Sequence, residues 1–144
     1  MKRILIISDG IPGHFHQSKG VALMLSETYE CAISSHELSW RLYFLRSACN
    51  AFAKLLLRLN NKNIARGILW LYTPINIQGH DLVIAAGGNT MQVTAAIKLA
   101  HALPVIQLGS PRGLHSSKFN ALITVEKYFD HPSNIVAAIT PNIY

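Results

Sequence analysis

Residues 2–14 read KRILIISDGIPGH and join a short apolar run to a turn that contains two glycines. The run at residues 3–8 is rich in β-branched side chains and suits a strand that is covered on both faces. The turn at residues 9–13 precedes a helical pattern whose expected apolar side carries Val21, Leu23, Met24 and Leu25. A strand, a glycine turn and a helix form the opening unit of a Rossmann-like fold.

Further apolar runs repeat this pattern along the chain. Strands are expected at residues 31–38, 81–86, 104–108 and 121–125, with a last one at 135–139. Residues 90–102 have helical spacing, with Val93, Ala96, Ile97 and Ala100 on one side, which predicts a βαβ crossover. Strands that alternate with helices form parallel sheets. We therefore predict a single α/β domain over residues 1–144, with a Rossmann-like open parallel sheet and helices on both faces.

The composition narrows the class of protein. Half of the 144 residues are hydrophobic, which is enough for one buried core. Thirteen Lys and Arg against seven Asp and Glu give a net charge of +6, which favours anionic partners but also simply keeps small proteins soluble. Cys31 and Cys49 lack metal-type spacing and are expected as free thiols. The apolar runs are too short for a signal peptide or a membrane span, so the expected location is cytoplasmic.

Residues 39–72 depart from the alternating pattern, because they hold two helical stretches split near residues 60–63. In the first stretch Ser47, Asn50, Lys54 and Arg58 form a polar stripe on an otherwise apolar helix. One interpretation is a core-packing helix with a solvated basic face. The other is a basic, aromatic surface that lies on an anionic membrane or docks a protein partner. The residues expected on such a surface are Trp40, Arg41, Phe44, Arg46, Lys54 and Arg58.

Three loops with glycine follow three of the expected strands, at residues 8–14, 87–90 and 109–113. In open parallel sheets ligands bind at the carboxyl ends of the strands, so these loops are expected to line one crevice. Gly10 and Gly13 permit close backbone approach, and the helix N-terminus behind them favours an anion or a sugar hydroxyl. The loops match neither the dinucleotide-binding nor the Walker pattern, which argues against both standard nucleotide sites.

Several side chains in these loops have a predicted role in catalysis, ligand binding or helix capping. His14 is a candidate general base that Asp9 would orient, with an exposed loop histidine as the alternative. Arg112 is the candidate cation for a phosphate or carboxylate, because a guanidinium binds two oxygens at once. Asn89 or Thr90 is expected to cap the helix that follows. No metal site is expected, because His14 and His16 lack further ligands.

Several blocks of the sequence resemble one family. They are ISDGIPGHFHQSKGVALML at residues 7–25, DLVIAAGGNT at 81–90, QLGSPR at 107–112 and NIV at 134–136. In order and spacing these blocks are similar to those of the bacterial mitochondrial-fission ELM-like proteins, which are labelled as predicted nucleoside-diphosphate-sugar epimerases. The resemblance implies a GT-B glycosyltransferase-like architecture of two Rossmann-like domains, of which this chain resembles the amino-terminal one.

In such proteins the amino-terminal half holds the acceptor, and the carboxyl-terminal half holds the nucleotide-sugar donor. The resemblance therefore implies an acceptor-binding domain that takes a sugar or phosphosugar, has no cofactor of its own, and needs a companion carboxyl-terminal domain for catalysis. It also implies contact with the inner face of the membrane through residues 39–72. The site residues carried over by position are Asp9, Gly10, Gly13, His14, Gln17, Ser18, Gly87, Asn89, Thr90, Pro111 and Arg112.

A second hypothesis treats the chain as a non-catalytic module. In it the Rossmann-like body is a scaffold, and residues 39–72 bind a protein partner or a second copy of the chain. A large exposed apolar patch on that segment would favour this hypothesis. Nucleic acid is not expected as a partner, because no nucleic-acid-reading motif accompanies the basic residues.

Overall fold

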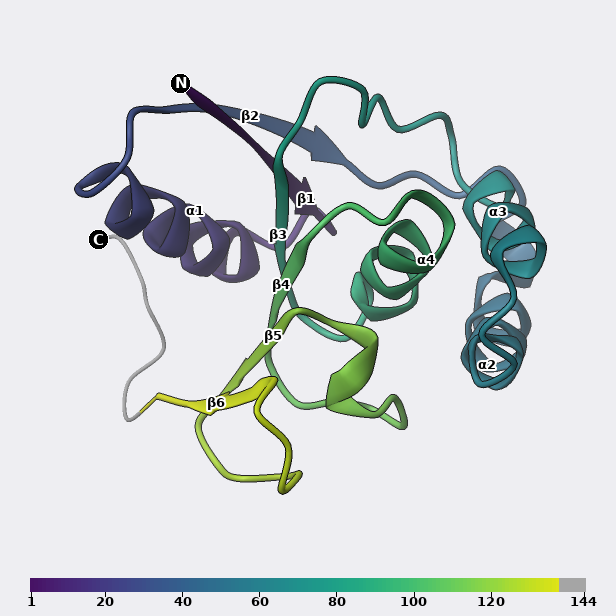
Figure 1. Cartoon of the computed structure of the whole chain (residues 1–144). Helices are drawn as coiled ribbons and strands as arrows, with labels where there is room; N and C mark the ends of the chain where they lie inside the picture. Colours follow the sequence, from purple (N-terminus) through teal and green to yellow (C-terminus); the bar gives the residue numbers. More distant parts are fainter. Residues whose placement is uncertain (138–144) are drawn as a thin grey trace.

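A computed structural model describes residues 1–137 of the chain as a six-stranded sheet flanked by helices (Figure 1). The strands are β1 (Lys2–Ser8), β2 (Cys31–Glu37), β3 (Leu82–Ala86), β4 (Val105–Leu108), β5 (Ala121–Thr124) and β6 (Asn134–Val136). Their order is β2-β1-β3-β4-β5-β6, and every neighbouring pair is parallel. The predicted Rossmann-like open parallel sheet is confirmed. The last strand begins one residue before the predicted range, and residues 138–139 of that range lie outside the described residues.

Helices cover both faces of the sheet, as predicted (Figure 1). Helix α1 (Pro12–Ser26) packs on β1 and β3 from one side, and α4 (Met91–His101) connects β3 to β4 on the other. Helices α2 (Arg46–Leu57) and α3 (Lys62–Trp70) pack on the outer side of α4. Residues 39–72 therefore form the expected pair of helices and add a third layer. Short 3-10 turns lie at η1 (Tyr43–Leu45) and η2 (Ser116–Lys118).

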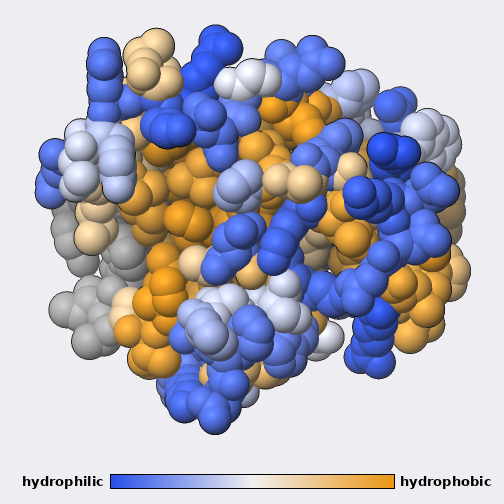
Figure 2. Space-filling view, in the orientation of Figure 1, coloured by the Kyte–Doolittle hydropathy of each residue, from blue (hydrophilic) through white to orange (hydrophobic). Residues whose placement is uncertain are grey.

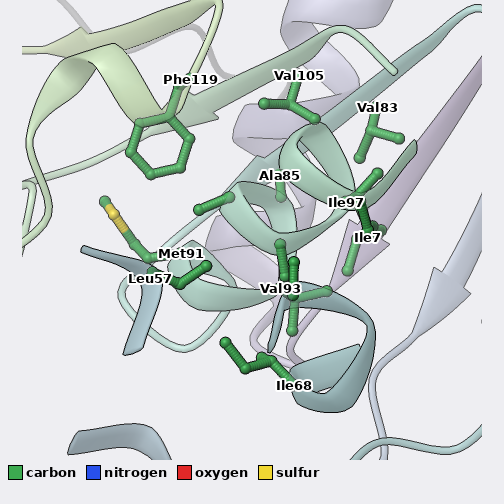
Figure 3. Close-up of a cluster of buried hydrophobic side chains, with 14 of the residues drawn as sticks. Ile7, Leu57, Ile68, Val83, Ala85, Met91, Val93, Ile97, Val105 and Phe119 are labelled. Carbon is green, nitrogen blue, oxygen red and sulfur yellow. The ribbon is translucent and has the colours of Figure 1, made fainter. Parts of the chain in front are cut away.

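The apolar core has two parts, one on each face of the sheet. Alternate residues of β1 point to opposite faces, so Ile4 and Ile6 pack towards α1 while Leu5 and Ile7 pack towards α4. The α4 side is the larger part, and its side chains come from the sheet and from three helices (Figure 3). Helix α4 is buried almost all round, because it lies between the sheet and the outer helices.

The apolar side predicted for α1 is partly wrong. Leu23 and Met24 are exposed, whereas the side facing the sheet carries Ser18, Val21 and Ala22. These three residues are three and four positions apart, which places them on one side of a helix. Leu23 and Met24 follow Ala22 by one and two positions. Because an α-helix has 3.6 residues per turn, their side chains point away from the sheet.

Helix α2 has the opposite orientation to the one expected from its polar stripe. Asn50 and Lys54 are half-buried and face the molecule beside the buried Ala53, whereas the apolar Phe52 and Leu55 face outwards. The predicted solvated polar face is therefore wrong for the middle of the stripe. The physical reason is that Asn50 finds a hydrogen-bond partner in the buried Gln92 of α4.

No helix within residues 1–137 is long and apolar enough to cross a membrane.

Candidate functional site

The three predicted loops lie at the same edge of the sheet, because they follow the carboxyl ends of the parallel strands β1, β3 and β4. Each loop turns at a glycine with positive φ: Gly10 at +84°, Gly87 at +92° and Gly109 at +112°. This backbone conformation strains any residue with a Cβ atom. The glycines thus set the shape of the edge.

Asp9 and His14 form a pair at this edge. The Nδ1 atom of His14 lies 2.8 Å from Oδ2 of Asp9, whose side chain is only 3% exposed. The carboxylate also accepts hydrogen bonds from the backbone N–H of Ile11, at 3.2 Å, and from the amide of Asn89, at 3.3 Å. Because a carboxylate only accepts, Nδ1 of His14 carries a proton, and in the neutral imidazole Nε2 is then the nitrogen with the lone pair. The histidine side chain is 32% exposed, so a ligand hydroxyl can reach it.

The turn Gly87-Gly88 brings His14 and Arg112 together. A Cβ atom on Gly87 would lie 2.5 Å from Cε1 of His14, so the imidazole lies directly over this glycine. A Cβ atom on Gly88 would lie 2.6 Å from Nε of Arg112, so the guanidinium covers the next residue. The candidate base and the candidate anion-binding cation therefore occupy adjacent positions on one turn.

The side chain of Gln107 fixes the position of this turn through hydrogen bonds. Its amide nitrogen donates to the carbonyl oxygen of Gly87 at 3.0 Å, and its amide oxygen accepts from the hydroxyl of Thr94 at 2.8 Å. All these groups are buried, and satisfied buried polar networks rigidify a structure. Gln107 is not among the predicted site residues. Its signal in the sequence is a polar residue inside the apolar run of β4.

Lys54 of α2 adds a second cation near Arg112. Burial, and then the positive charge of Arg112, lower the pKa of the Lys54 ammonium. Neither side chain forms an ion pair with a carboxylate among residues 1–137. Helix α4 begins at the same turn without a side-chain cap, so its positive end adds to the field of the cations. This part of the edge favours an anion.

A buried polar cluster connects α2 to the start of α4. The amide nitrogen of Gln92 donates to the hydroxyl of Tyr72 at 3.0 Å, to the carbonyl oxygen of Asn89 at 3.1 Å, and to the side chain of Asn50. Burial raises the pKa of the Tyr72 phenol, although the hydrogen bond from Gln92 opposes this shift in part. The cluster therefore positions Asn89, the residue that contacts Asp9.

Replacing Tyr72 by Phe is expected to lower the free energy of unfolding by about 1 kcal/mol, the usual net value of one buried hydrogen bond. Urea denaturation measures this change. Tyr43→Phe is the matched control, because among residues 1–137 the exposed Tyr43 hydroxyl has a hydrogen bond only with Arg46. An equal loss in both variants would contradict a structural role for the Tyr72 hydroxyl.

Two hollows flank the Asp9–His14 pair. The first has a volume of about 420 Å³ and includes Asp9, Trp40, Arg46, Asn50 and Asn89 in its lining. The second, of about 300 Å³, lies on the side of His14. Its lining includes His14, Gln17, Gly87, Gly109, Ser110 and Tyr128. A hollow of about 430 Å³ beside α3 is lined by none of the predicted crevice residues.

Six of the nine predicted ligand-binding residues line neither hollow. They are Gly10, Gly13, Ser18, Thr90, Pro111 and Arg112. Ser18 is buried and donates to the carbonyl oxygen of His14 at 3.1 Å. Thr90 is buried and donates to the carbonyl oxygen of Gly87 at 3.0 Å, so it does not cap α4 as predicted. Pro111 is buried in the turn that carries Arg112. Gly13 lies in the first turn of α1 with open space around it. The buried members of this set help to shape the edge of the sheet.

The surface predicted for residues 39–72 is divided between different sides of the molecule. Trp40 stacks on Tyr72 with ring centroids 4.3 Å apart, and both Trp40 and Arg46 line the first hollow. The positive charge of Arg112 lowers the pKa of Lys54 in addition to burial, and Arg41 donates to the carbonyl oxygen of Tyr72 at 2.8 Å. Of the six predicted residues, Phe44 and Arg58 are exposed without such contacts within the described part of the chain. The other four residues lie at the crevice or take part in packing within residues 39–72.

The fold and this edge define an α/β protein of Rossmann-like build with a polar, partly cationic crevice at the carboxyl ends of its strands. Comparison of the chain with protein-family models, with curated proteins and with solved structures finds no match.

Proposed function

We propose that the crevice binds a phosphorylated, hydroxyl-rich ligand such as a phosphosugar. The observation that carries this proposal is the placement of the Asp9–His14 pair and Arg112 over adjacent residues of one turn. Arg112 and Lys54 would bind the phosphate, and Nε2 of His14 would accept a hydrogen bond from a sugar hydroxyl. The phosphate lies on the Gly88 side, because the buried carboxylate of Asp9 would repel it on the other.

The role of His14 extends to proton transfer. With Nδ1–H held by Asp9, Nε2 can take the proton of a hydroxyl as that oxygen attacks an electrophile. The electrophile would be the anomeric carbon of a nucleotide-sugar. As the new glycosidic bond forms, the bond from this carbon to the diphosphate breaks, and the nucleoside diphosphate leaves with the electron pair. Binding and activating the attacking hydroxyl is the role of the acceptor-binding half of a GT-B glycosyltransferase-like protein, with the nucleotide-sugar donor held by a companion domain. The chain alone would therefore bind the acceptor without catalysis.

Isothermal titration calorimetry with glucose 1-phosphate and inorganic phosphate tests the binding role. Arg112→Ala is expected to weaken binding about tenfold or more, because one charge-assisted hydrogen bond contributes about 1.5–3 kcal/mol. Arg66→Ala is the matched control, because it removes the same charge from an exposed position on α3. Binding that is equally weakened by both variants, or unchanged in Arg112→Ala, would overturn the proposed site.

The His14→Ala variant distinguishes the contribution of the sugar to binding from that of the phosphate. This variant is expected to weaken binding of glucose 1-phosphate while leaving binding of inorganic phosphate within about twofold, because it removes the hydroxyl partner and not the cations. An equal effect on both ligands would place His14 outside the sugar subsite. Binding of uridine diphosphate glucose with higher affinity than glucose 1-phosphate would instead indicate a donor site on this chain.

A further inference from the structure

The outward side of α2 carries an apolar row. Phe52, Leu55 and Leu59 lie at spacings of three and four, which places them on one side of α2 and its C-terminal turn, and Phe44 precedes the helix in η1. All four are exposed, and Phe44 is 80% exposed. Ala53 and Leu57, on the opposite side of the helix, are buried against α4. The larger part of each side chain in the row is therefore open to solvent in the described part of the chain.

Helix α3 carries a second outward row, which is basic and ends in an aromatic residue. Lys62, Arg66 and Trp70 are spaced four apart and are all exposed. The opposite side of α3 buries Ala65 and Ile68 in the same core cluster that receives α2. Both rows thus face away from α4 in the same outer layer. Figure 2 shows apolar atoms next to hydrophilic ones at the right edge of the molecule, where α2 and α3 lie.

The charge of the protein is concentrated in this layer. Six of the thirteen basic residues lie between residues 38 and 80, and none of the seven acidic residues does. The remaining parts of the chain carry seven basic and seven acidic residues, so this segment accounts for the whole net charge of +6. Arg58, Lys62 and Arg66 are exposed and lie around or after the carboxyl end of the apolar row, and the exposed Arg46 lies near its start.

We propose that the outer layer, defined by the rows Phe44, Phe52, Leu55, Leu59 and Lys62, Arg66, Trp70 with Arg58 between them, binds an anionic lipid bilayer. Apolar side chains enter the boundary between headgroups and acyl chains, and the basic side chains contact acidic headgroups. The 12 residues of α2 make a helix of about 18 Å, which suits a position in the plane of the membrane. Trp70 is of the residue type that prefers this interface.

An anionic membrane fits the surface better than a protein partner does. Residues 39–79 carry six basic residues and no acidic one, so the occupant has to supply negative charge along the whole segment. A second copy of the chain would also bring the same uncompensated positive charge to the contact. A bilayer of acidic lipids supplies an apolar interior and negative charge together.

Vesicle co-sedimentation of the whole chain tests this proposal. We expect binding to mixed phosphatidylcholine–phosphatidylglycerol vesicles, little binding to phosphatidylcholine alone, and release at high salt. The double variant Phe44→Ser/Phe52→Ser is expected to lower the partition coefficient at least tenfold. Lys62→Gln/Arg66→Gln is expected to lower it about twenty-five-fold, from about fivefold for each basic residue.

Matched control variants remove the same types of side chain, apolar or positively charged, from surfaces outside the outer layer. Met24→Ser removes an exposed apolar residue from α1, and Lys2→Gln/Lys127→Gln removes two exposed positive charges outside the layer. These variants and Arg112→Ala are expected to leave vesicle binding within about twofold, which separates this surface from the crevice. Circular dichroism checks that each variant is folded.

Three results would overturn the proposal. The first is an absence of binding to anionic vesicles. The second is a loss of binding in the controls equal to that in the outer-layer variants. The third is concentration-dependent self-association that Phe44→Ser/Phe52→Ser abolishes, because it would assign the apolar row to a second copy of the chain.

Discussion

Gly87→Ala is expected to lower the free energy of unfolding by about 2–4 kcal/mol, the range for strain and a lost buried contact together. The φ angle of +92° strains any residue with a Cβ atom by about 1–2 kcal/mol. The new methyl group would also overlap the imidazole of His14. If His14 moves away, the buried carboxylate of Asp9 loses its closest side-chain partner. Urea denaturation measures the stability, and the calorimetric assay should show loss of sugar binding.

Gly13→Ala is the control for this substitution. A Cβ atom on Gly13 meets nothing within 4 Å, and the residue lies in the first turn of α1. Alanine there is expected to leave stability unchanged or to raise it by up to about 1 kcal/mol, because glycine is a poor helix residue. A Gly87→Ala protein as stable as the Gly13→Ala protein would contradict the close packing of His14 on the turn.

Leu57→Ala is expected to lower the free energy of unfolding by about 2–4 kcal/mol through the cavity that it leaves. Leu57 is 1% exposed and packs in the core beside Met91 and Phe119 (Figure 3). Its loss would loosen α2 from α4, which also disturbs the contact between Asn50 and Gln92. Thermal and urea denaturation measure the effect.

Leu55→Ala is a matched control on the same helix, two residues earlier. Leu55 is 56% exposed, so the same substitution is expected to change stability by no more than about 0.5 kcal/mol. The pair therefore tests the orientation of α2 directly. A larger loss in Leu55→Ala than in Leu57→Ala would mean that the apolar row faces inwards, and it would remove the surface proposed for the membrane.

The strands and their loops could be predicted because each depends on a short local pattern. The apolar run of β1 is covered on both faces, and its loop lies at the sheet edge in any parallel arrangement. The sequence also placed Asp9 and His14 close enough to pair. It could not show that the side chains of His14 and Arg112 pack on Gly87 and Gly88, because these contacts join three separate loops.

The orientation of α2 could not be predicted for a different reason. Most of its residues are apolar, so the polar stripe was the main guide to the exposed side. That guide failed because Asn50 has a partner, Gln92, that lies 42 positions away in the sequence. Thr90 is a similar case, since its hydroxyl bonds to the preceding turn rather than to the helix it begins. Tertiary hydrogen bonds override local preference at both positions.

The strand order has a consequence for synthesis on the ribosome. Strand β1 lies between β2 and β3, and β3 begins at Leu82. While residues 9–81 are being translated, β1 pairs on one edge at most, and its apolar residues have no strand on the other side. Open strand edges and exposed apolar surface make nascent chains prone to aggregation. We expect cells to produce more soluble protein when translation through this interval is fast or when a chaperone binds the emerging amino terminus.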